Sequence, residues 1–321
     1  MKANDDWTGA KRVLCVRLDA LGDVLMTSPA LAALKASGEE RRLTLLASSA
    51  GAAIAPLLPM IDETIVYDAP WMKATTLRSE GSFDRAMMER LRADRFDAAV
   101  IFTVYSQNPL PAALFCHLAD IPRRLAHARE NPYQLLTDWI AEPEPQQFVR
   151  HEVQRQLDLV AAIGARTEEV RLAIRIRPEI VEGMLDRLTS AGIEFDRPWL
   201  VIHPGASAPS RRYPPENFAA AARILALNHR CQLVFTGSQQ EGPLIESVIG
   251  AAGVPAICLA GRTSLEELAA LLSHASLLIS NNTGPVHLAA AVGTPVIALF
   301  GPTDPRVWGP RGSNVRIIPM K

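Results

Sequence analysis

The sequence predicts an α/β fold in which two domains each hold a parallel sheet. Short apolar runs, of the length of buried strands, alternate with segments of helix length along most of the chain. This alternation is typical of parallel strands joined by right-handed crossovers. At 321 residues the chain is long for a single core, so two domains of about 150 residues are expected. We place the boundary between about Ala165 and Pro178, which gives domains of residues 1–170 and 171–321.

The first domain begins with a strand and a helix and continues in the same order. Apolar runs predict strands at residues 12–17, 43–48, 64–67, 98–102 and 124–128, and the segments between and after them predict helices at residues 24–37, 50–58, 83–94, 108–120 and 150–163. Gly38 ends the first helix, and Pro29 inside it predicts a kink or a restart at Ser28. Pro143 to Gln147 form a polar break, which we interpret as the loosest segment of the chain.

The second domain repeats this order. The pattern predicts helices at residues 178–191, 216–227, 241–251, 265–273 and 285–292, and strands at residues 199–203, 232–236, 256–259, 277–280 and 296–300. Residues 315–318 predict a last strand at the edge of the sheet. The predicted architecture is therefore two Rossmann-like halves that face each other across a cleft.

The composition is that of an ordinary globular enzyme. Hydrophobic residues make up 48% of the chain and charged residues 21%, and the formal net charge of −1 gives no basic field for nucleic acid. No apolar run approaches the roughly 18 residues of a membrane-spanning helix, and the polar start, Met1 to Thr8, is unlike a signal peptide. The four cysteines are far apart without a Cys-x-x-Cys pair, which favours reduced thiols in a cytoplasmic protein over zinc or disulfides.

The stretch from Leu277 to Asp304 carries the clearest site signal. It reads as a strand, a tight turn, a short helix and a second strand, with the N-cap residue types Asn282 and Thr283 before Pro285. Such a turn leaves backbone N–H groups free at a helix start, where the helix dipole adds positive potential. This arrangement is typical of a phosphate site at the sheet edge where α/β proteins bind ligands. The alternative is a well-capped helix with nothing bound.

Two arginines suit the same phosphate chemistry. Arg211 and Arg212 follow a turn of small residues, Pro204 to Ser207, after a predicted strand. Their fork-shaped cations at a strand's carboxyl end suit a diphosphate, although a solvated pair on a loop is the alternative. His287, on the first turn of the later helix, has the donor for a phosphate or a sugar hydroxyl, with a core-facing histidine as the alternative.

Acidic residues follow two other strands. Asp23 stands at the first strand–turn–helix, where the helix dipole favours its ionised form, and we interpret it either as a general base or as a helix cap. Asp19 competes for the role of base, but Gly22 allows a ligand to approach Asp23 closely. Glu241, with Gln239, either holds ribose hydroxyls or is simply a residue of the first helical turn.

Two missing motifs narrow the chemistry. No Gly-x-Gly-x-x-Gly follows any predicted strand, which argues against an oxidoreductase with a dinucleotide cofactor. No Asp-x-Asp occurs, so we expect no metal held beside a diphosphate by that pattern and no cofactor. The negative charge of a leaving diphosphate must then be stabilised by Arg211, Arg212 and backbone N–H groups.

Taken together, these motifs resemble those of glycosyltransferase family 9, the ADP-heptose:lipopolysaccharide heptosyltransferases of GT-B fold, over nearly the whole chain. Val13 to Arg17 followed by Leu21 to Leu25 is similar to the family's amino-terminal signature, whose aspartate, here Asp23, is the proposed base. Pro204-Gly205 through Pro214 resembles its Lys/Arg-x-Trp-Pro segment, whose first basic residue, here Arg211, meets the diphosphate.

The donor-binding signature of the family has a counterpart near the end of the chain. Ser280 to Ala291, with Gly301-Pro302-Thr303, resembles that signature, and Gly261, Thr263 and Leu265 fit the segment before it. The donor-binding set expected from the motifs and the resemblance is Ser207, Arg211, Arg212, Gln239, Glu241, Thr263, Asn282, Thr283, Gly284, Pro285 and His287.

The resemblance implies an inverting, metal-independent transfer of heptose from ADP-heptose to a lipopolysaccharide-core acceptor. The donor binds mainly the second domain, and the lipid-linked, phosphorylated acceptor binds the first. Arg124, Arg150 and Arg155 are candidates to meet its anionic groups, with a solvated face as the alternative. We expect a cytoplasmic protein, either free or peripheral on the inner face of the cytoplasmic membrane.

Two departures from the family leave alternatives open. Many members carry Asp where this chain has Asn282, a position that touches the donor sugar in the resemblance. The chain ends at Lys321, where relatives often continue into a helix that crosses back onto the first domain, so we expect either a short protein or a shortened sequence. The alternatives are transfer of another nucleotide-sugar to another acceptor, a sugar-nucleotide epimerase or hydrolase of this fold, and a non-catalytic nucleotide-sugar-binding protein.

Overall fold

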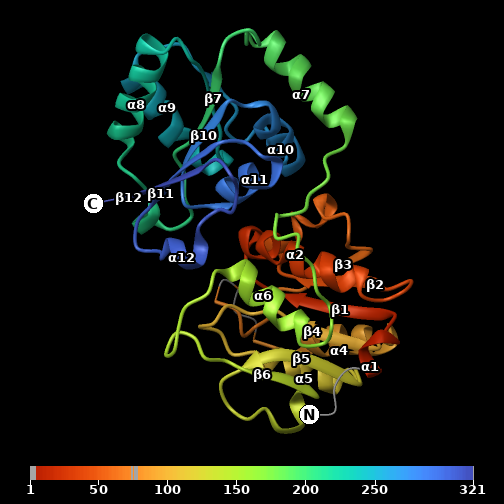
Figure 1. The fold of residues 1–321 in the computed structure, drawn as a ribbon. Helices are drawn as coiled ribbons and strands as arrows, with labels where there is room; N and C mark the ends of the chain where they lie inside the picture. Colours follow the sequence, from red (N-terminus) through yellow and green to blue (C-terminus); the bar gives the residue numbers. More distant parts are fainter. Residues whose placement is uncertain (1–4, 74, 76–78, 321) are drawn as a thin grey trace. The chain divides into compact units, whose positions relative to one another are not determined.

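A computed structural model describes residues 5–73, 75 and 79–320 of the chain (Figure 1). The chain divides into two compact units, Met1–Ala173 and Ile174–Lys321. The division after Ala173 lies within the interval in which the sequence predicts the boundary. Each unit contains one six-stranded sheet with helices on its faces.

In the first unit, all six strands are parallel in the order β3-β2-β1-β4-β5-β6. The strands are β1 (Arg12–Arg17), β2 (Arg42–Ala47), β3 (Glu63–Val66), β4 (Ala98–Ile101), β5 (Arg123–Ala128) and β6 (Asp138–Ala141). The central strands are apolar and buried, as strands covered on both faces must be.

The helices of the first unit cover both faces of its sheet. They are α1 (Asp5–Thr8), α2 (Leu21–Ala36), α3 (Ser49–Ala52), α4 (Ser82–Ala93), α5 (Leu110–Leu118) and α6 (Glu152–Ala161), with short 3₁₀ turns η1 (Ala55–Leu57) and η2 (Tyr133–Leu135). Leu91 of α4 and Phe115 of α5 join Leu14 of β1 in one apolar cluster. On the other face, α2 packs against α6 (Figure 1). The predicted restart at Ser28 is wrong, because α2 continues through Pro29 without interruption.

In the second unit, the six parallel strands have the order β12-β11-β10-β7-β8-β9. The strands are β7 (Trp199–His203), β8 (Gln232–Phe235), β9 (Ile257–Cys258), β10 (Leu277–Asn281), β11 (Val296–Phe300) and β12 (Val315–Pro319). The helices are α7 (Pro178–Ser190), α8 (Pro215–Asn228), α9 (Gly242–Ala252), α10 (Leu265–His274), α11 (Gly284–Val292) and α12 (Pro305–Trp308), with 3₁₀ turns η3 (Pro209–Arg211) and η4 (Gln239–Glu241). Helices α8 and α9 pack together, and α10 packs against α7 and α11.

Both sheets have a topological switch point, a pair of neighbouring strands from which the later strands are added towards opposite edges of the sheet. In the first unit it lies between β1 and β4, because β2 and β3 extend one way and β5 and β6 the other. In the second unit it lies between β7 and β10 for the same reason. The loops that follow these strands form the edge where open α/β sheets bind ligands.

The sequence missed one strand and misjudged the segment after it. The edge strand β6 alternates between exposed and half-buried residues, so it lacks the apolar run that marks the other strands. The segment from Pro143 to Gln147 is not simply loose, because Glu144 within it is fully buried. Its carboxylate accepts hydrogen bonds from the backbone N–H and the guanidinium of Arg150, which tie the segment down.

Candidate functional site

In the second unit, Asn281 organises the carboxyl edge of the sheet. This buried side chain at the end of β10 donates from Nδ2 to the carbonyl of Pro204 at 2.7 Å and accepts the N–H of Tyr213 at Oδ1 at 3.0 Å. The loop that leaves β7 is therefore fixed next to the end of β10, where α11 is about to begin. Asn281 thus joins the two sides of the switch point.

The same loop carries Arg211. A Cβ on Gly301, which follows β11, would lie 3.0 Å from the carbonyl oxygen of Ser210, so the two loops are in close contact. The side chain of Arg211 is half-buried and forms no hydrogen bond or ion pair within the part of the chain that the structure describes. Arg212 is exposed and donates from Nε to the carbonyl of Ala206 at 2.8 Å. Arg211 therefore has the guanidinium with more donors left for a ligand.

The start of α11 has the free donors that the sequence predicts. Thr283 at the N-cap forms no side-chain capping bond, and its hydroxyl instead approaches the carbonyl oxygen of Asn281 at 3.4 Å. An uncapped start leaves amide hydrogens of the first turn for a ligand. Asn282 is buried and donates from Nδ2 to Thr303 at 2.8 Å, and His287 is also buried, which favours its core-facing alternative.

On the other side of the switch point, Glu241 serves as a helix cap. Its Oε2 accepts from the N–H and the hydroxyl of Ser238, at 2.8 and 2.9 Å. A Cβ on Gly205 would overlap the Glu241 carboxylate, so only glycine at position 205 lets the carboxylate lie against the loop after β7. Glu241 is therefore a residue of the first helical turn, which is the second of the two roles predicted for it. It also lies beside the candidate site. Ser207 and Gln239 are exposed and Thr263 is half-buried around this edge.

In the first unit, a fully buried arginine gathers three carboxylates beside the switch point. Arg17 is the last residue of β1, and its Nε lies 3.0 Å from Oδ2 of Asp19. Its Nη2 lies 2.8 Å from Oε1 of Glu152 and 3.5 Å from Oδ1 of Asp23. Glu152, the first residue of α6, also accepts from Nε2 of Gln156 at 2.6 Å. One cation thus faces three carboxyl groups in a largely buried site.

Burial raises the proton affinity of two carboxylates in this cluster. Burial raises the pKa of Asp23, with the nearby Asp19 adding to the rise and Arg17 opposing it. Burial also raises the pKa of Glu152 to about 7, against the lowering effect of Arg17. Burial therefore outweighs any effect of the helix dipole, which favours the ionised form of Asp23. A carboxylate with a raised pKa is a stronger base, which suits proton abstraction.

Asp23 is more available to a substrate than Asp19. Arg17 engages one carboxylate oxygen of Asp19, and the amide of Gln107 donates to the other. The Asp19 side chain is 11% exposed, whereas that of Asp23 is 22% exposed and has the longer contact with Arg17. The geometry therefore favours Asp23 as the candidate base.

The three arginines proposed for the acceptor are engaged within the protein. Arg124 is buried, and its guanidinium donates to the backbone carbonyls of Ile121, Gln134 and Leu135. It therefore has a structural role, and its predicted contact with an acceptor is not supported.

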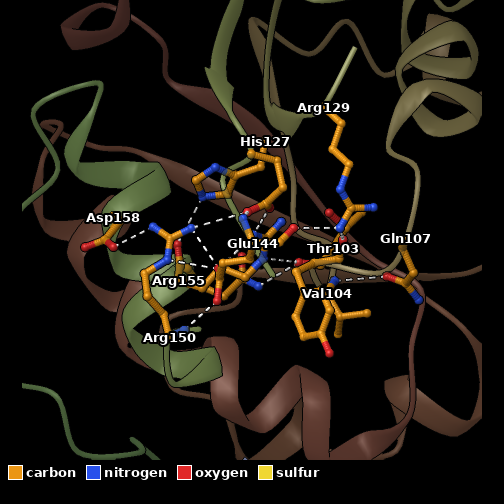
Figure 2. A network of polar contacts seen from close by, with 12 residues as sticks. Thr103, Val104, Gln107, His127, Arg129, Glu144, Arg150, Arg155 and Asp158 are labelled. Carbon is orange, nitrogen blue, oxygen red and sulfur yellow. Dashed lines mark hydrogen bonds and ion pairs between the residues drawn. The ribbon is translucent and has the colours of Figure 1, made fainter. Parts of the chain in front are cut away.

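Arg150 and Arg155 belong to a dense ion-pair network (Figure 2). Both lie near the carboxylates of Glu142 and Glu144, and Arg150 also pairs with Asp158 at 2.7 Å. Arg155 is buried as well. Their charges are neutralised within the unit, so they are poor candidates for meeting anionic groups of an acceptor.

Four residues of the candidate sites were not singled out from the sequence: Arg17, Gln107, Glu152 and Asn281. A signal existed for Arg17 and for Asn281, because each is a polar residue at the carboxyl end of a strand that is mainly apolar and buried. No local pattern links Glu152 to Arg17, since 135 positions separate them.

Two other classes of site are not seen in the described part of the chain. Over residues 5–73, 75 and 79–320, no group of three or more His, Cys, Asp or Glu side chains is placed to hold a metal ion. Within the same residues, no helix has the length and apolar character needed to cross a bilayer. A hollow of about 510 Å³ at the opposite, amino-terminal edge of the first sheet is lined by Lys35, Gly38, Glu40, Arg41, Arg42 and Asp62, away from the strand ends described above.

The chain is similar to known heptosyltransferases in sequence. It is 26% identical over 320 residues to lipopolysaccharide heptosyltransferase 2 of Salmonella typhimurium, covering 96% of this chain and 87% of the relative. It is 25% identical over 303 residues to lipopolysaccharide heptosyltransferase 3 of Escherichia coli, covering 92% of this chain and 83% of the relative.

Solved structures share the fold. A family 9 glycosyltransferase from Veillonella parvula matches with a TM-score of 0.82 and 21% identity, over 100% of this chain and 87% of that one. E. coli ADP-heptose lipopolysaccharide heptosyltransferase II matches with a TM-score of 0.76 and 21% identity, over 96% and 90% of the two chains. E. coli heptosyltransferase WaaC with ADP matches with a TM-score of 0.70 and 22% identity, over 97% and 93%.

These matches confirm the predicted GT-B fold, with a Rossmann-like parallel sheet in each unit. The model of glycosyltransferase family 9 (heptosyltransferase) matches residues 85–320, which is more than half of the sequence. The chain therefore belongs to glycosyltransferase family 9, the heptosyltransferase family, and is a glycosyltransferase.

Proposed function

We propose that this enzyme transfers heptose from ADP-heptose to a hydroxyl of a lipopolysaccharide-core acceptor, with inversion at the anomeric carbon and without a metal. Curated relatives at 25–26% identity are lipopolysaccharide heptosyltransferases, which supports the sugar and the acceptor class. A structure of the same fold is described with ADP, which supports the nucleotide. Because such an acceptor is lipid-linked, the enzyme works at the inner face of the cytoplasmic membrane.

The second unit binds the donor in this proposal, and one observation carries it. Asn281 fixes the loop that bears the unengaged guanidinium of Arg211 next to the uncapped start of α11. A cation and free amides at one sheet edge match the charge and oxygens of a diphosphate. Ser207, Gln239, Glu241 and Thr263 then contact the nucleoside, and Asn282, Thr283, Gly284, Pro285 and His287 form the helix start.

The first unit binds the acceptor and supplies the base. Asp23 takes the proton of the acceptor hydroxyl while the oxygen of that hydroxyl forms a bond to the anomeric carbon. The bond from that carbon to the diphosphate oxygen breaks on the opposite face, and ADP leaves with the electron pair. Arg211 and the start of α11 stabilise the negative charge that develops on the departing diphosphate.

The test is a reaction of the full chain with ADP-heptose and a heptose-free lipopolysaccharide-core oligosaccharide, followed by mass spectrometry and ADP detection. We expect the acceptor to gain one heptose per ADP released, at the same rate with and without a chelator. Release of ADP at an equal rate without acceptor indicates a hydrolase instead. ADP is also expected to raise the melting temperature more than UDP, GDP or CMP, and no stabilisation by ADP contradicts the proposal.

One specific alternative for the donor is an ADP-hexose in place of ADP-heptose. The Nδ2 of Asn282 donates to Thr303, which leaves one neutral accepting oxygen where an aspartate has two charged ones. Transfer of a hexose from an ADP-sugar in preference to heptose, measured in the same assay, supports this alternative, and exclusive transfer of heptose removes it.

A further inference from the structure

The buried cluster around Arg17 includes one carboxyl group that the proposed reaction does not use. Glu152 is the first residue of α6, and its side chain is fully buried. Its Oε1 accepts hydrogen bonds from Nη2 of Arg17 at 2.8 Å and from Nε2 of Gln156 at 2.6 Å. Because a buried ion pair adds little net stability, stability alone does not explain the presence of Glu152.

Glu152 and Asp23 share one nitrogen of Arg17. Nη2 lies 2.8 Å from Oε1 of Glu152 and 3.5 Å from Oδ1 of Asp23. The Nε of the same guanidinium lies 3.0 Å from the carboxylate of Asp19. The guanidinium is thus held at Nε by Asp19 and at Nη2 by Glu152, and the contact with Asp23 is the longest of the three.

The sharing of Arg17 makes Asp23 a better proton acceptor. Attraction to a cation weakens with distance, and a like charge nearby raises the proton affinity of a carboxylate. Ionised Glu152 acts in both ways, since it holds the cation and adds a negative charge of its own. Burial is the largest cause of the raised pKa of Glu152, and the charge of Asp23 adds to the rise. Such coupling is mutual, so the charge of Glu152 raises the pKa of Asp23 in turn.

Glu152 can gain or lose a proton without losing its two contacts. Its Oε2 is buried and accepts no hydrogen bond from the described residues, whereas Oε1 makes both contacts. A proton on Oε2 therefore leaves Oε1 free to accept from Arg17 and Gln156. The pKa of this carboxyl group, which burial raises to about 7, places the change of charge near neutral pH.

Beyond the cluster itself, neighbouring elements bring few titratable groups near Glu152. Helix α2 packs against α6, and the only other titratable residue of α2, Lys35, lies in its last turn. Strand β5 contributes His127, and burial lowers the pKa of that ring to about 3, so it is neutral at pH 7. On α6, Arg155 pairs with the carboxylate of Glu142. Within the described part of the first unit, the titration of Glu152 is therefore the main change of charge beside the candidate base near neutral pH.

We propose that Glu152 is a positioning residue for the candidate base: it holds the guanidinium of Arg17 away from Asp23 and so keeps Asp23 a strong proton acceptor. This inference rests on the proposed function, because it takes Asp23 to be the base of the transfer. Asp23 contacts the acceptor hydroxyl, whereas Glu152 acts through Arg17 and through its own charge. A neutral group at position 152, either protonated glutamate or glutamine, leaves Asp23 the weaker base.

The test is the pH profile of kcat/KM for heptose transfer, measured on the full chain for wild type and Glu152→Gln. Glutamine keeps the shape of the side chain and matches its protonated form. We expect equal values at about two pH units below the pKa of Glu152, where wild type also has a neutral group at this position. At about pH 8.5 we expect Glu152→Gln to be about threefold slower or more, because a weaker base abstracts a proton more slowly. A ratio that is the same at every pH overturns the proposal, since a structural defect alone gives that result.

Two variants separate this effect from others. Glu152→Asp keeps the charge and is expected to recover part of the rate lost at high pH. Asp158→Asn removes a carboxylate from the same helix, where it pairs with Arg150 at 2.7 Å (Figure 2). We expect the ratio of Asp158→Asn to wild type to be the same at every pH. A ratio that changes with pH as in Glu152→Gln overturns the role of the shared nitrogen.

Carbon-13 NMR of the Asp23 carboxyl carbon gives a readout that does not need turnover, with the resonance assigned by its loss in Asp23→Asn. We expect this carboxyl group to be fully ionised at a lower pH in Glu152→Gln than in wild type, and identical titration curves overturn the proposal. A difference between the curves without heptose transfer by wild type refutes the proposed function and leaves the coupling of the two carboxyl groups standing. Heptose transfer with identical curves refutes the coupling alone.

Discussion

At the scale of single residues, the two candidate sites depend on arginines in opposite situations. Arg17 is fully buried and pairs with three carboxylates, whereas Arg211 is half-buried without a partner among the described residues. A buried arginine with several partners fixes their geometry. A cation without a partner at a strand end is ready to bind an anion. In the proposed reaction, the first organises the base and the second meets the leaving group.

Removing the charge of Arg211 tests its role. Arg211→Gln is expected to weaken ADP binding roughly 10- to 100-fold, since a hydrogen bond to a charged group contributes about 1.5–3 kcal/mol. Isothermal titration with ADP measures the change. Arg197→Gln is the control, because Arg197 is an exposed arginine just before β7 that pairs with Glu194 at 2.8 Å and donates to the carbonyl of Arg230. An ADP affinity that is equal in the two variants contradicts the assignment.

Glu152 predicts a pH dependence of stability. Its pKa is raised from 4.5 to about 7 in the folded chain, so the folded state keeps the proton over a range where the unfolded chain has lost it. Stability from this group is therefore complete below about pH 4.5 and is lost as the pH rises towards 7. In Glu152→Gln that loss is absent. The variant is expected to gain about 1 kcal/mol or more relative to wild type between pH 4.5 and 8, because one pKa unit is about 1.4 kcal/mol.

Urea unfolding at several pH values measures this gain. Asp158→Asn is the control on the same helix, since Asp158 pairs with Arg150 and is partly exposed. Parallel pH profiles for wild type and Glu152→Gln contradict the raised proton affinity of Glu152.

At the scale of elements, the sequence predicts most of the two sheets. The strands Arg12–Arg17, Trp199–His203 and Val296–Phe300 were predicted with the bounds that the structure has, because buried parallel strands are continuous apolar runs between turn residues. Strand β6 was missed, since an edge strand with one exposed face has no such run.

The candidate site was less predictable than the strands. The turn before α11 could be read locally, because it depends on neighbouring residues. The ion pairs of Arg150 and Arg155 could not be predicted locally, since their partners Glu142 and Glu144 follow a strand that the sequence did not reveal. Pairing between side chains that distant strands bring together is decided by the tertiary fold.

Asn281 is expected to hold the donor edge together. Asn281→Ala leaves the N–H of Tyr213 and the carbonyl of Pro204 without their partner, which costs about 1–3 kcal/mol for each buried group that stays unsatisfied. It also frees the loop that carries Arg211, so ADP affinity falls as well. Urea unfolding and ADP titration measure the two effects. Asn217→Ala, at an exposed position of α8, is expected to change neither. Full ADP affinity in Asn281→Ala contradicts the role of this residue in positioning the loop.

At the scale of the whole molecule, the same sheet topology occurs twice with different chemistry at the switch point. The first unit places carboxylates there, and the second places Arg211, which has no partner among the described residues, beside the uncapped start of α11. A proton acceptor and an anion site are the two requirements of an inverting sugar transfer from a nucleotide donor. Family 9 membership states the reaction class, and the residues at the two switch points explain how this chain would perform it.

The most direct measurement compares Asp23→Asn with wild type for both donor affinity and turnover. We predict that ADP-heptose binds the variant with unchanged affinity, whereas kcat for heptose transfer falls about 100-fold or more, as loss of a general base does. Asp68→Asn, two residues after β3 of the same sheet, is the control and is expected to keep most of the activity. Equal kcat values for Asp23→Asn and wild type would contradict the account, because Asp23 would then take no part in the reaction.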